Sequence, residues 1–329
     1  RQFLTDPEWV TKLLENRTQD IKPCICCHSG CFNFSSCKGH ANTQDLSDTM
    51  GLARCALNPE TMQSRKYHLE PAKKLKTIAI IGGGIGGMEA ALVCAKRGHK
   101  VTLYEKSSTL GGVFIAAAAP SFKEKDRELI AWYIRELQKY PITIKLNTEI
   151  KSVASLSADE VIVATGATAR KINVTGAETA IEAIDYLLGS REVGENVAVI
   201  GGGLTGCEIA YDLYLKGKHP TIIEMQDDLI TTKGICLANT SYLRDFFKTN
   251  KVPVFLETSL SQIKSGSVEL IDKTGNQFVL PADSVIMSVG YTPAPIAAKG
   301  KHIHVIGDAA KVGNLRTVIW GAWDVCMKL

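Results

Sequence analysis

Apolar and polar positions repeat in the same order in two stretches of the chain. The first is IAIIGGGIGGMEAALVCAKRGHKVTLYEK (78–106), and the second is VAVIGGGLTGCEIAYDLYLKGKHPTIIEM (197–225). Each begins with an apolar run typical of a buried strand. A glycine turn, apolar residues at helical spacing and a second apolar run that ends in Glu then follow. The pattern predicts a strand–helix–strand unit twice, and therefore an α/β fold.

Both copies carry glycines at the spacing G-x-G-x-x-G, and an acid closes the second strand. The corresponding residues are Gly82, Gly84, Gly87 and Glu105 in the first copy, and Gly201, Gly203, Gly206 and Glu224 in the second. In this motif the first glycine permits a tight turn, the second admits a pyrophosphate, and the third lets helix pack on strand. The acid can accept hydrogen bonds from a ribose diol. A lone fingerprint could be only a tight turn, but here strand, helix and acid all accompany it. We therefore predict two dinucleotide sites.

Composition excludes several other classes of function. The net charge is only +4, which gives no reason to expect nucleic acid or an anionic membrane as a partner. The longest apolar runs, such as 113–120, are too short to span a bilayer. The N-terminus is polar, without a signal peptide, and begins at Arg1 rather than Met, so we expect a cytoplasmic fragment or processed product. Ten cysteines in such a chain indicate metal ligands, redox groups or small buried side chains.

Four of those cysteines stand in CICCHSGC (24–31), where Cys24, Cys27 and Cys31 form a C-x2-C-x3-C run. A fourth ligand could come from Cys37 or Cys55. Zinc accepts four thiolates, but a tight triad with one remote cysteine favours a 4Fe–4S cluster. We expect Cys26 to point away from the metal.

Two dinucleotide units in one chain suggest a flavin beside a nicotinamide. The sequence resembles the glutathione-reductase-like flavoproteins in EKSSTLGG (105–112), DEVIVATGA (159–167), DSVIMSVGY (283–291) and HVIGDAA (304–310). The resemblance implies two Rossmann-like dinucleotide-binding domains, the second inserted in the first. The FAD-binding domain would comprise 76–178 and 291–329, and the NAD(H)-binding domain 179–290.

The same resemblance implies the residues that hold each nucleotide. Those for FAD would be Gly82, Gly84, Gly86, Gly87, Glu105, Lys106, Gly111, Gly112, Ile150, Ala164, Thr165, Gly166, Gly307 and Asp308. Those for the nicotinamide nucleotide would be Gly201, Gly203, Leu204, Thr205, Gly206, Glu224 and Gly290. After Glu224 the chain reads MQDD, with no basic residue to receive a 2′-phosphate, so we expect NADH rather than NADPH.

A narrower resemblance rests on RCALNP, which contains Cys55. With the C-x2-C-x3-C run, it is similar to the 2,4-dienoyl-CoA reductase, enoate reductase and trimethylamine dehydrogenase family. The resemblance implies a 4Fe–4S cluster on Cys24, Cys27, Cys31 and Cys55, within a cysteine-rich loop over 21–75. Residues 1–20 would be the end of an upstream TIM barrel and its linker. The segment between Cys31 and Cys55 is longer than in that family, which leaves Cys37 as a rival ligand.

In that family the substrate reacts on FMN inside the barrel. The resemblance therefore implies an electron-input module. Electrons would pass from NADH to FAD, to the cluster, and to FMN in the upstream barrel domain or a partner subunit. We expect no catalytic side chain here, and a homo-oligomer at full length. Two alternatives stay open: a structural nucleotide-binding half like that of trimethylamine dehydrogenase, or an input subunit resembling the small subunit of glutamate synthase.

Overall fold

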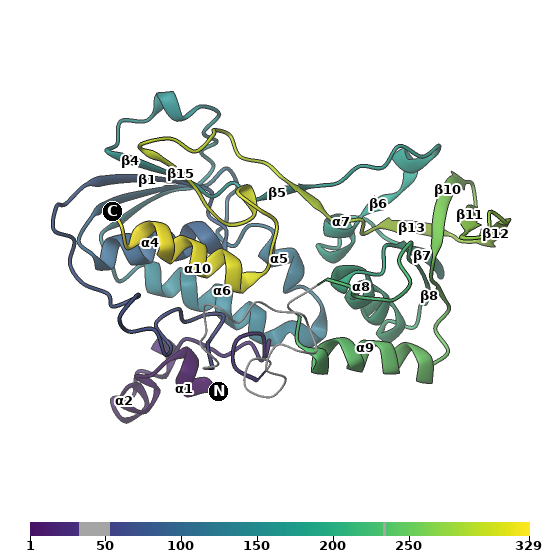
Figure 1. Cartoon of the computed structure of the whole chain (residues 1–329), viewed down its shortest axis with the longest axis horizontal. Coiled ribbons are helices and arrows are strands. Elements are labelled where there is room, and N and C mark those ends of the chain that lie inside the picture. Colours follow the sequence, from purple (N-terminus) through teal and green to yellow (C-terminus); the bar gives the residue numbers. More distant parts are fainter. Residues whose placement is uncertain (33–52, 233–234) are drawn as a thin grey trace.

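The computed structural model describes residues 1–32, 53–232 and 235–329. Its first unit is a five-stranded parallel sheet in the order β15-β4-β1-β2-β3. The strands are β1 (Thr77–Ile81), β2 (Lys100–Tyr104), β3 (Ile142–Lys145), β4 (Glu160–Val163) and β15 (Ile303–Val305). Helices α4 (Ile85–Lys96), α6 (Glu124–Leu137) and α10 (Leu315–Cys326) form one layer beside this sheet (Figure 1).

The second unit repeats this arrangement. Its parallel sheet has the order β6-β13-β7-β8-β9. The strands are β6 (Ile181–Glu182), β7 (Asn196–Ile200), β8 (His219–Ile223), β9 (Val254–Phe255) and β13 (Ser284–Met287). Its helices are α7 (Ala183–Leu187), α8 (Leu204–Leu215) and α9 (Leu237–Thr249). An antiparallel meander of β10 (Thr258–Lys264), β11 (Ser267–Asp272) and β12 (Gln277–Pro281) extends from it (Figure 1).

Two short strands join the units. The chain leaves the first unit through β5 (Ala167–Ala169) and returns through β14 (Tyr291–Pro293), and the two pair antiparallel. The second unit is thus inserted in the first, which confirms the predicted fold class. The domain bounds assigned from the sequence stay a prediction.

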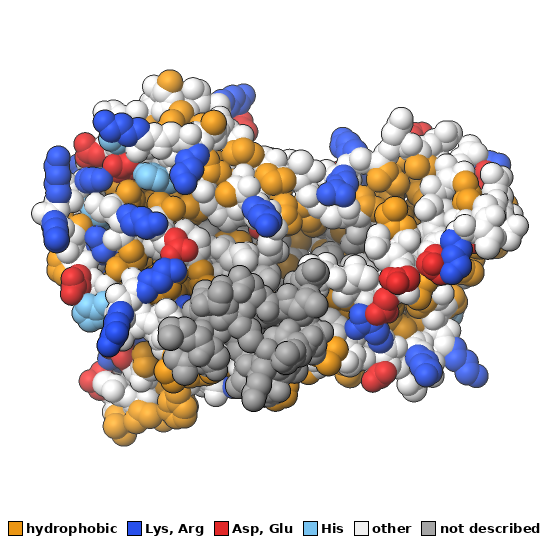
Figure 2. Space-filling view, viewed as in Figure 1, with side chains coloured by type: hydrophobic (Ala, Val, Ile, Leu, Met, Phe, Trp, Pro, Cys, Tyr) orange, Lys and Arg blue, Asp and Glu red, His pale blue; other side chains and the backbone are white. Residues whose placement is uncertain are grey.

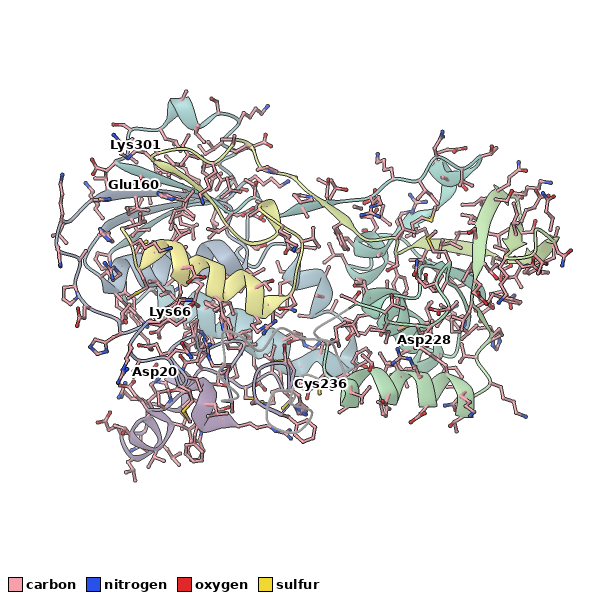
Figure 3. The ribbon with its side chains drawn as sticks, in the orientation of Figure 1. Asp20, Lys66, Glu160, Asp228, Cys236 and Lys301 are labelled. Atoms are coloured by element: carbon pink, nitrogen blue, oxygen red, sulfur yellow. The ribbon has the colours of Figure 1, made fainter. Side chains whose placement is uncertain are left out.

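The N-terminal segment lies against the helical layer of the first unit. It contains α1 (Gln2–Thr5), α2 (Trp9–Leu14) and the 3-10 turn η1 (Thr18–Asp20). The Trp132 indole of α6 donates to the Asp20 carbonyl at 2.9 Å, and Lys139 pairs with the Asp20 carboxylate at 2.7 Å. Figure 3 labels Asp20 below that helical layer. These contacts hold the cysteine-bearing segment that follows η1 beside α6.

The remaining short elements are α5 (Phe114–Ala117) and four 3-10 turns: η2 (Ser121–Lys123), η3 (Val153–Ser155), η4 (Ala177–Thr179) and η5 (Gly307–Ala309). Each sheet has its own apolar core. Ile80, Met88 and Leu103 are fully buried in the first, and Val199, Ile209 and Ile222 in the second. Among the described helices, none combines the length and apolar character needed to cross a bilayer.

Candidate functional site

In the turn from β1 to α4, two glycines of the first fingerprint are required by close packing and the third borders open space. Gly82 has a φ of +106°, and a Cβ there would lie 2.4 Å from the Ala164 carbonyl oxygen. A Cβ on Gly87 would lie 1.8 Å from the Gly82 carbonyl oxygen. A Cβ on Gly84 would meet nothing nearer than Gly112 Cα, at 4.0 Å. Packing therefore requires the first and third glycines. The second borders open space at the N-terminus of α4, which suits a pyrophosphate.

The turn from β7 to α8 has the same geometry. Gly201 has a φ of +103°, and its added Cβ would lie 2.4 Å from the Ser288 carbonyl oxygen. A Cβ on Gly206 would lie 1.9 Å from the Gly201 carbonyl oxygen, while one on Gly203 would meet no atom within 4 Å. Leu204 and Thr205 begin α8 directly behind this open position. The second turn can therefore receive a pyrophosphate in the same way as the first.

The two strand-end acids are buried against their glycine turns. The Glu105 carboxylate accepts from the Gly83 amide at 2.6 Å and from the Ser107 amide at 2.8 Å. The Glu224 carboxylate accepts from the Gly202 amide at 2.6 Å and from the Gln226 amide at 2.8 Å. Each carboxylate keeps one oxygen that accepts a single hydrogen bond from the turn, so both acids can still accept a ribose hydroxyl.

The structure brings most of the other residues predicted for FAD around the first turn. Gly111 forms an isolated parallel bridge with Gly84, and its amide donates to the Gly83 carbonyl at 2.8 Å. Gly112 lies beside Gly84 as well. Ala164 closes the turn from β4, and the adjoining Thr165 hydroxyl donates to the Ala294 carbonyl at 2.7 Å. Gly166 is left-handed, with a φ of +74°.

The late motif reaches the same helix from the other end of the chain. Added Cβ atoms on Gly86 and Gly307 would lie 3.1 and 3.5 Å from the same Val318 methyl group, so η5 and α10 pack against α4. Burial raises the pKa of Asp308, and the Gly313 amide donates to its carboxylate at 3.0 Å.

The other predicted residues are Lys106, Ile150 and Gly290, which have different surroundings. Lys106 is exposed, and Ile150 packs on the apolar core that includes Val161 and Val163. Gly290 has a φ of +92° just before β14, and its carbonyl accepts from the Arg170 amide at 2.9 Å.

Cys24, Cys27, Cys31 and Cys55 line one pocket, together with apolar side chains such as Leu4 and Leu57. Cys26, expected to point away, lines the same pocket. Two chain segments meet there, because the Arg54 amide donates to the Gly30 carbonyl at 2.6 Å. A Cβ on Gly30 would lie 2.7 Å from the Arg54 carbonyl oxygen, so a side chain there would separate the segments. The Thr5 hydroxyl lies 3.4 Å from the Cys55 sulfur.

The thiols of these cysteines affect one another. Burial raises the pKa of Cys27 to about 12, and the neighbouring Cys55, Cys31 and Cys24 contribute to that rise. Over the described residues no three Cys, His, Asp or Glu side chains are arranged to hold a metal ion. The preference for a 4Fe–4S cluster over zinc stays a prediction. Cys26 is exposed, and Cys37 lies outside the described residues, so the choice between Cys37 and Cys55 stays a prediction.

Sequence reasoning missed three charged residues beside these sites. Lys22 and Glu89 are both buried, and their ion pair joins the cysteine segment to α4. A glutamate inside the apolar run IGGMEAALV was the available signal for this pair. Arg244 of α9 pairs with Asp228 at 2.9 Å, and Asp228 lies four residues after Glu224. The fold thus brings a basic side chain to the segment MQDD, which contains none of its own.

Comparison with known proteins supplies the wider context. A family model described as "Pyridine nucleotide-disulphide oxidoreductase" matches residues 50–158 and 76–312. The chain is 36% identical to a cinnamate reductase of Clostridium sporogenes, over 100% of this chain and 49% of that protein. It is 32% identical to an NADH oxidase of Thermoanaerobacter brockii, over 100% of this chain and 51% of that protein. It thus spans about half the length of these curated relatives.

Solved structures agree with this architecture. A 2-naphthoyl-CoA reductase superposes with a TM-score of 0.88 and 25% identity, over 100% of this chain and 50% of that one. A thioredoxin reductase from T. acidophilum superposes with a TM-score of 0.62 and 18% identity, over 78% of this chain and 98% of that one. The second likeness shows the fold alone.

Proposed function

Because the chain belongs to the pyridine nucleotide-disulphide oxidoreductase family, we propose that it is the electron-input half of a larger NADH-dependent flavoprotein oxidoreductase. The observation that carries this proposal is the combination of two glycine turns, each with an open second glycine, and one pocket lined by five cysteines, four of them the predicted ligands. The resemblance to the enoate and 2,4-dienoyl-CoA reductases is confirmed by matches that cover all of this chain and about half of a cinnamate reductase and of a 2-naphthoyl-CoA reductase.

Each part of the chain has a distinct role in this proposal. Gly84 and the N-terminus of α4 bind the pyrophosphate of FAD, and Glu105 accepts from its ribose. Gly203, α8 and Glu224 do the same for NADH. Cys24, Cys27, Cys31 and Cys55 hold a 4Fe–4S cluster as thiolates. When bound, the flavin and the cluster supply the conversion of a two-electron donor into single electrons. The chain's task is to bind and orient these groups, which needs no side-chain acid or base.

The acceptor would lie in a part of the protein that precedes this chain. Phe3, Val10, Leu13 and Leu14 are exposed on α1 and α2, and Leu14 is 78% exposed. Figure 2 shows apolar side chains gathered over these helices, at the lower left. Such a patch is typical of a contact surface. It supports an upstream FMN barrel that receives electrons from the cluster and carries the substrate site. A cytoplasmic location and a homo-oligomer remain part of the same proposal.

The test uses the chain purified without oxygen, and two glycine variants. Its absorption spectrum should show flavin and an iron–sulfur cluster, with about four irons per chain. It should oxidise NADH with ferricyanide as acceptor. Gly84→Leu should abolish flavin binding, because the side chain fills the space in which the pyrophosphate would lie. Gly203→Leu should retain the flavin and lose NADH oxidation. Each variant is the control for the other.

Other results would contradict specific parts of the proposal. Stoichiometric zinc without iron would exclude the cluster. Loss of flavin from Gly203→Leu with retention in Gly84→Leu would reverse the two nucleotide sites. Reduction of an unsaturated acid by this chain alone would show that the substrate site is not upstream.

A further inference from the structure

A buried ion pair connects the cysteine segment to the helix of the first glycine turn. Lys22 Nζ lies 3.4 Å from Glu89 Oε2, and the two side chains are 11% and 5% exposed. Lys22 stands two residues before Cys24, and Glu89 lies in the middle of α4. Removing two charges from water costs several kcal/mol for each ion unless good geometry compensates. No role in nucleotide binding or metal ligation accounts for this pair.

The negative end of the pair is fixed by all three helices of the layer. The Tyr133 hydroxyl of α6 and the Trp323 indole of α10 each donate to the Glu89 carboxylate, both at 2.6 Å. Burial alone would raise the pKa of Glu89, but Lys22 and these two donors outweigh it, and the pKa is lowered. Glu89 is therefore charged at neutral pH.

The positive end of the pair is bonded to the chain segment that carries Cys55. Lys22 Nζ donates to the Leu57 carbonyl at 2.8 Å, and both Leu57 and Cys55 line the cysteine pocket. The ring centroids of Trp132 and Tyr133 lie 5.0 and 5.1 Å from the ammonium. The Lys22 ammonium is thus held two residues from Cys55 along the chain, in surroundings with little water.

We propose that Lys22 tunes the reduction potential of the cluster that Cys55 would hold, and that Glu89 opposes it. This inference rests on the proposed function. Transfer of one electron from the reduced flavin adds one unit of negative charge to the cluster. A cation fixed nearby in a medium of low dielectric favours the reduced form of the cluster, and an anion disfavours it. Lys22 would thereby draw electrons from the flavin towards the cysteine segment.

The experiment measures the cluster's midpoint potential in the whole chain, by anaerobic redox titration followed by electron paramagnetic resonance. Lys22→Met should lower the midpoint potential by about 59 mV, which corresponds to a tenfold shift of this one-electron equilibrium towards the oxidised cluster. Glu89→Gln should shift it the other way. Lys22→Arg should stay close to the parent, because the charge is kept.

The second unit supplies a control with the same residue types. Lys216 pairs with the buried Asp212 at 2.6 Å, and its ammonium lies 5.1 Å from the Tyr186 ring centroid. The Lys216 side chain is 58% exposed, and the group belongs to the second unit. Lys216→Met should leave the potential of the cluster unchanged.

A double variant, Lys22→Met with Glu89→Gln, covers the case in which a lone buried charge prevents folding. The double variant differs from Glu89→Gln only at Lys22, where a positive charge is lost. The cluster in the double variant should therefore have a lower midpoint potential than the cluster in Glu89→Gln. Shifts of equal sign for Lys22→Met and Glu89→Gln, or no shift with the cluster intact, would overturn this inference alone. A parent chain without iron would overturn the cluster assignment and this inference with it.

Discussion

At the scale of single residues, Glu105 and Glu224 occupy corresponding positions in the two repeats but have different surroundings. The Glu105 carboxylate accepts a further hydrogen bond from the Ser107 hydroxyl at 2.8 Å. In the second copy Gln226 stands at that position, followed by the exposed Asp227 and Asp228. Arg244 is held by Asp228 and donates to the Leu229 carbonyl. The region around Glu224 is thus acidic, and its nearby cation is already engaged.

This environment predicts a preference for NADH. Glu224 can accept from a free 2′-hydroxyl and repels a 2′-phosphate. Glu224→Ala should lower the ratio of kcat/KM for NADH over NADPH by about tenfold to a hundredfold, since hydrogen bonds to charged groups contribute about 1.5–3 kcal/mol. Steady-state assays with ferricyanide measure the ratio. Glu105→Ala is the control, because it should weaken flavin binding without changing the ratio. A parent chain that uses NADPH as well as NADH would contradict the assignment.

The fingerprint residues could be predicted because their roles depend on local spacing. The conformations of Gly82 and Gly201, and the close packing at Gly87 and Gly206, follow from a tight strand–helix turn at a fixed interval. Lys22 and Arg244 could not be predicted in this way. Their partners, Glu89 and Asp228, are distant in sequence or come from another element, so only the tertiary fold brings them together.

At the scale of elements, the long buried strands and helices could be predicted from apolar periodicity, as for β1, α4, β7 and α8. The crossing strands β5 and β14 could not, since each has three residues and none of them is buried. The meander β10–β12 also escaped prediction. Its burial alternates only in part, and β10 has a register shift between Leu260 and Gln262.

One polar cluster joins the amino-terminal ends of three strands in the first sheet. Glu160 begins β4 and lies 2.7 Å from the Lys76 ammonium just before β1. It also lies 2.9 Å from His304 of β15 and 3.4 Å from His302. Figure 3 labels Glu160 at this edge, near Lys301. Burial alone would raise the pKa of Glu160, but the hydrogen bonds from Lys76, His304 and His302 lower it to about 2.

This cluster predicts an acid-dependent contribution to stability. A pKa lowered in the folded state means that the contribution is present above the ordinary value of 4.5 and is lost as pH falls through about 2. Glu160→Gln should therefore destabilise the chain by about 1 kcal/mol at pH 7, with a smaller effect as pH falls below 4. Thermal unfolding at several pH values measures the difference. A penalty that is constant across this range would contradict the electrostatic origin.

At the scale of the whole molecule, a small set of side chains holds the two units together in addition to the crossing strands. The Lys123 ammonium of the first unit lies 2.5 Å from the Glu208 carboxylate of α8. The rings of Phe122 and Tyr211 have centroids 4.9 Å apart. The Asn239 amide of α9 donates to the Cys27 carbonyl at 3.4 Å. Sequence reasoning could predict the two units but not this contact, because it depends on how the inserted unit is oriented.

Asp126, at the start of α6, makes this contact sensitive to pH. Its carboxylate lies 4.0 Å from Lys123, which also pairs with Glu208. Burial raises the pKa of Asp126 to about 6; Lys123 lowers it, and Glu208 raises it further. A raised pKa in the folded state favours the protonated carboxyl. The contribution of Asp126 to stability is thus fully present below the ordinary value of 3.8 and is lost as pH rises through about 6.

Asp126→Asn should therefore stabilise the chain above pH 6, because it removes a buried charge whose loss of hydration outweighs the attraction of Lys123 and Arg127. The gain should be on the order of 1–3 kcal/mol at pH 7.5, since one pKa unit corresponds to about 1.4 kcal/mol. It should shrink as the pH is lowered towards 4. Thermal unfolding of parent and variant across this range measures it. Asp245→Asn, at an exposed position on α9, is the control and should change little at any pH. Equal stability of Asp126→Asn and the parent at pH 7.5 would mean that ionised Asp126 is not a cost to the contact between the two units.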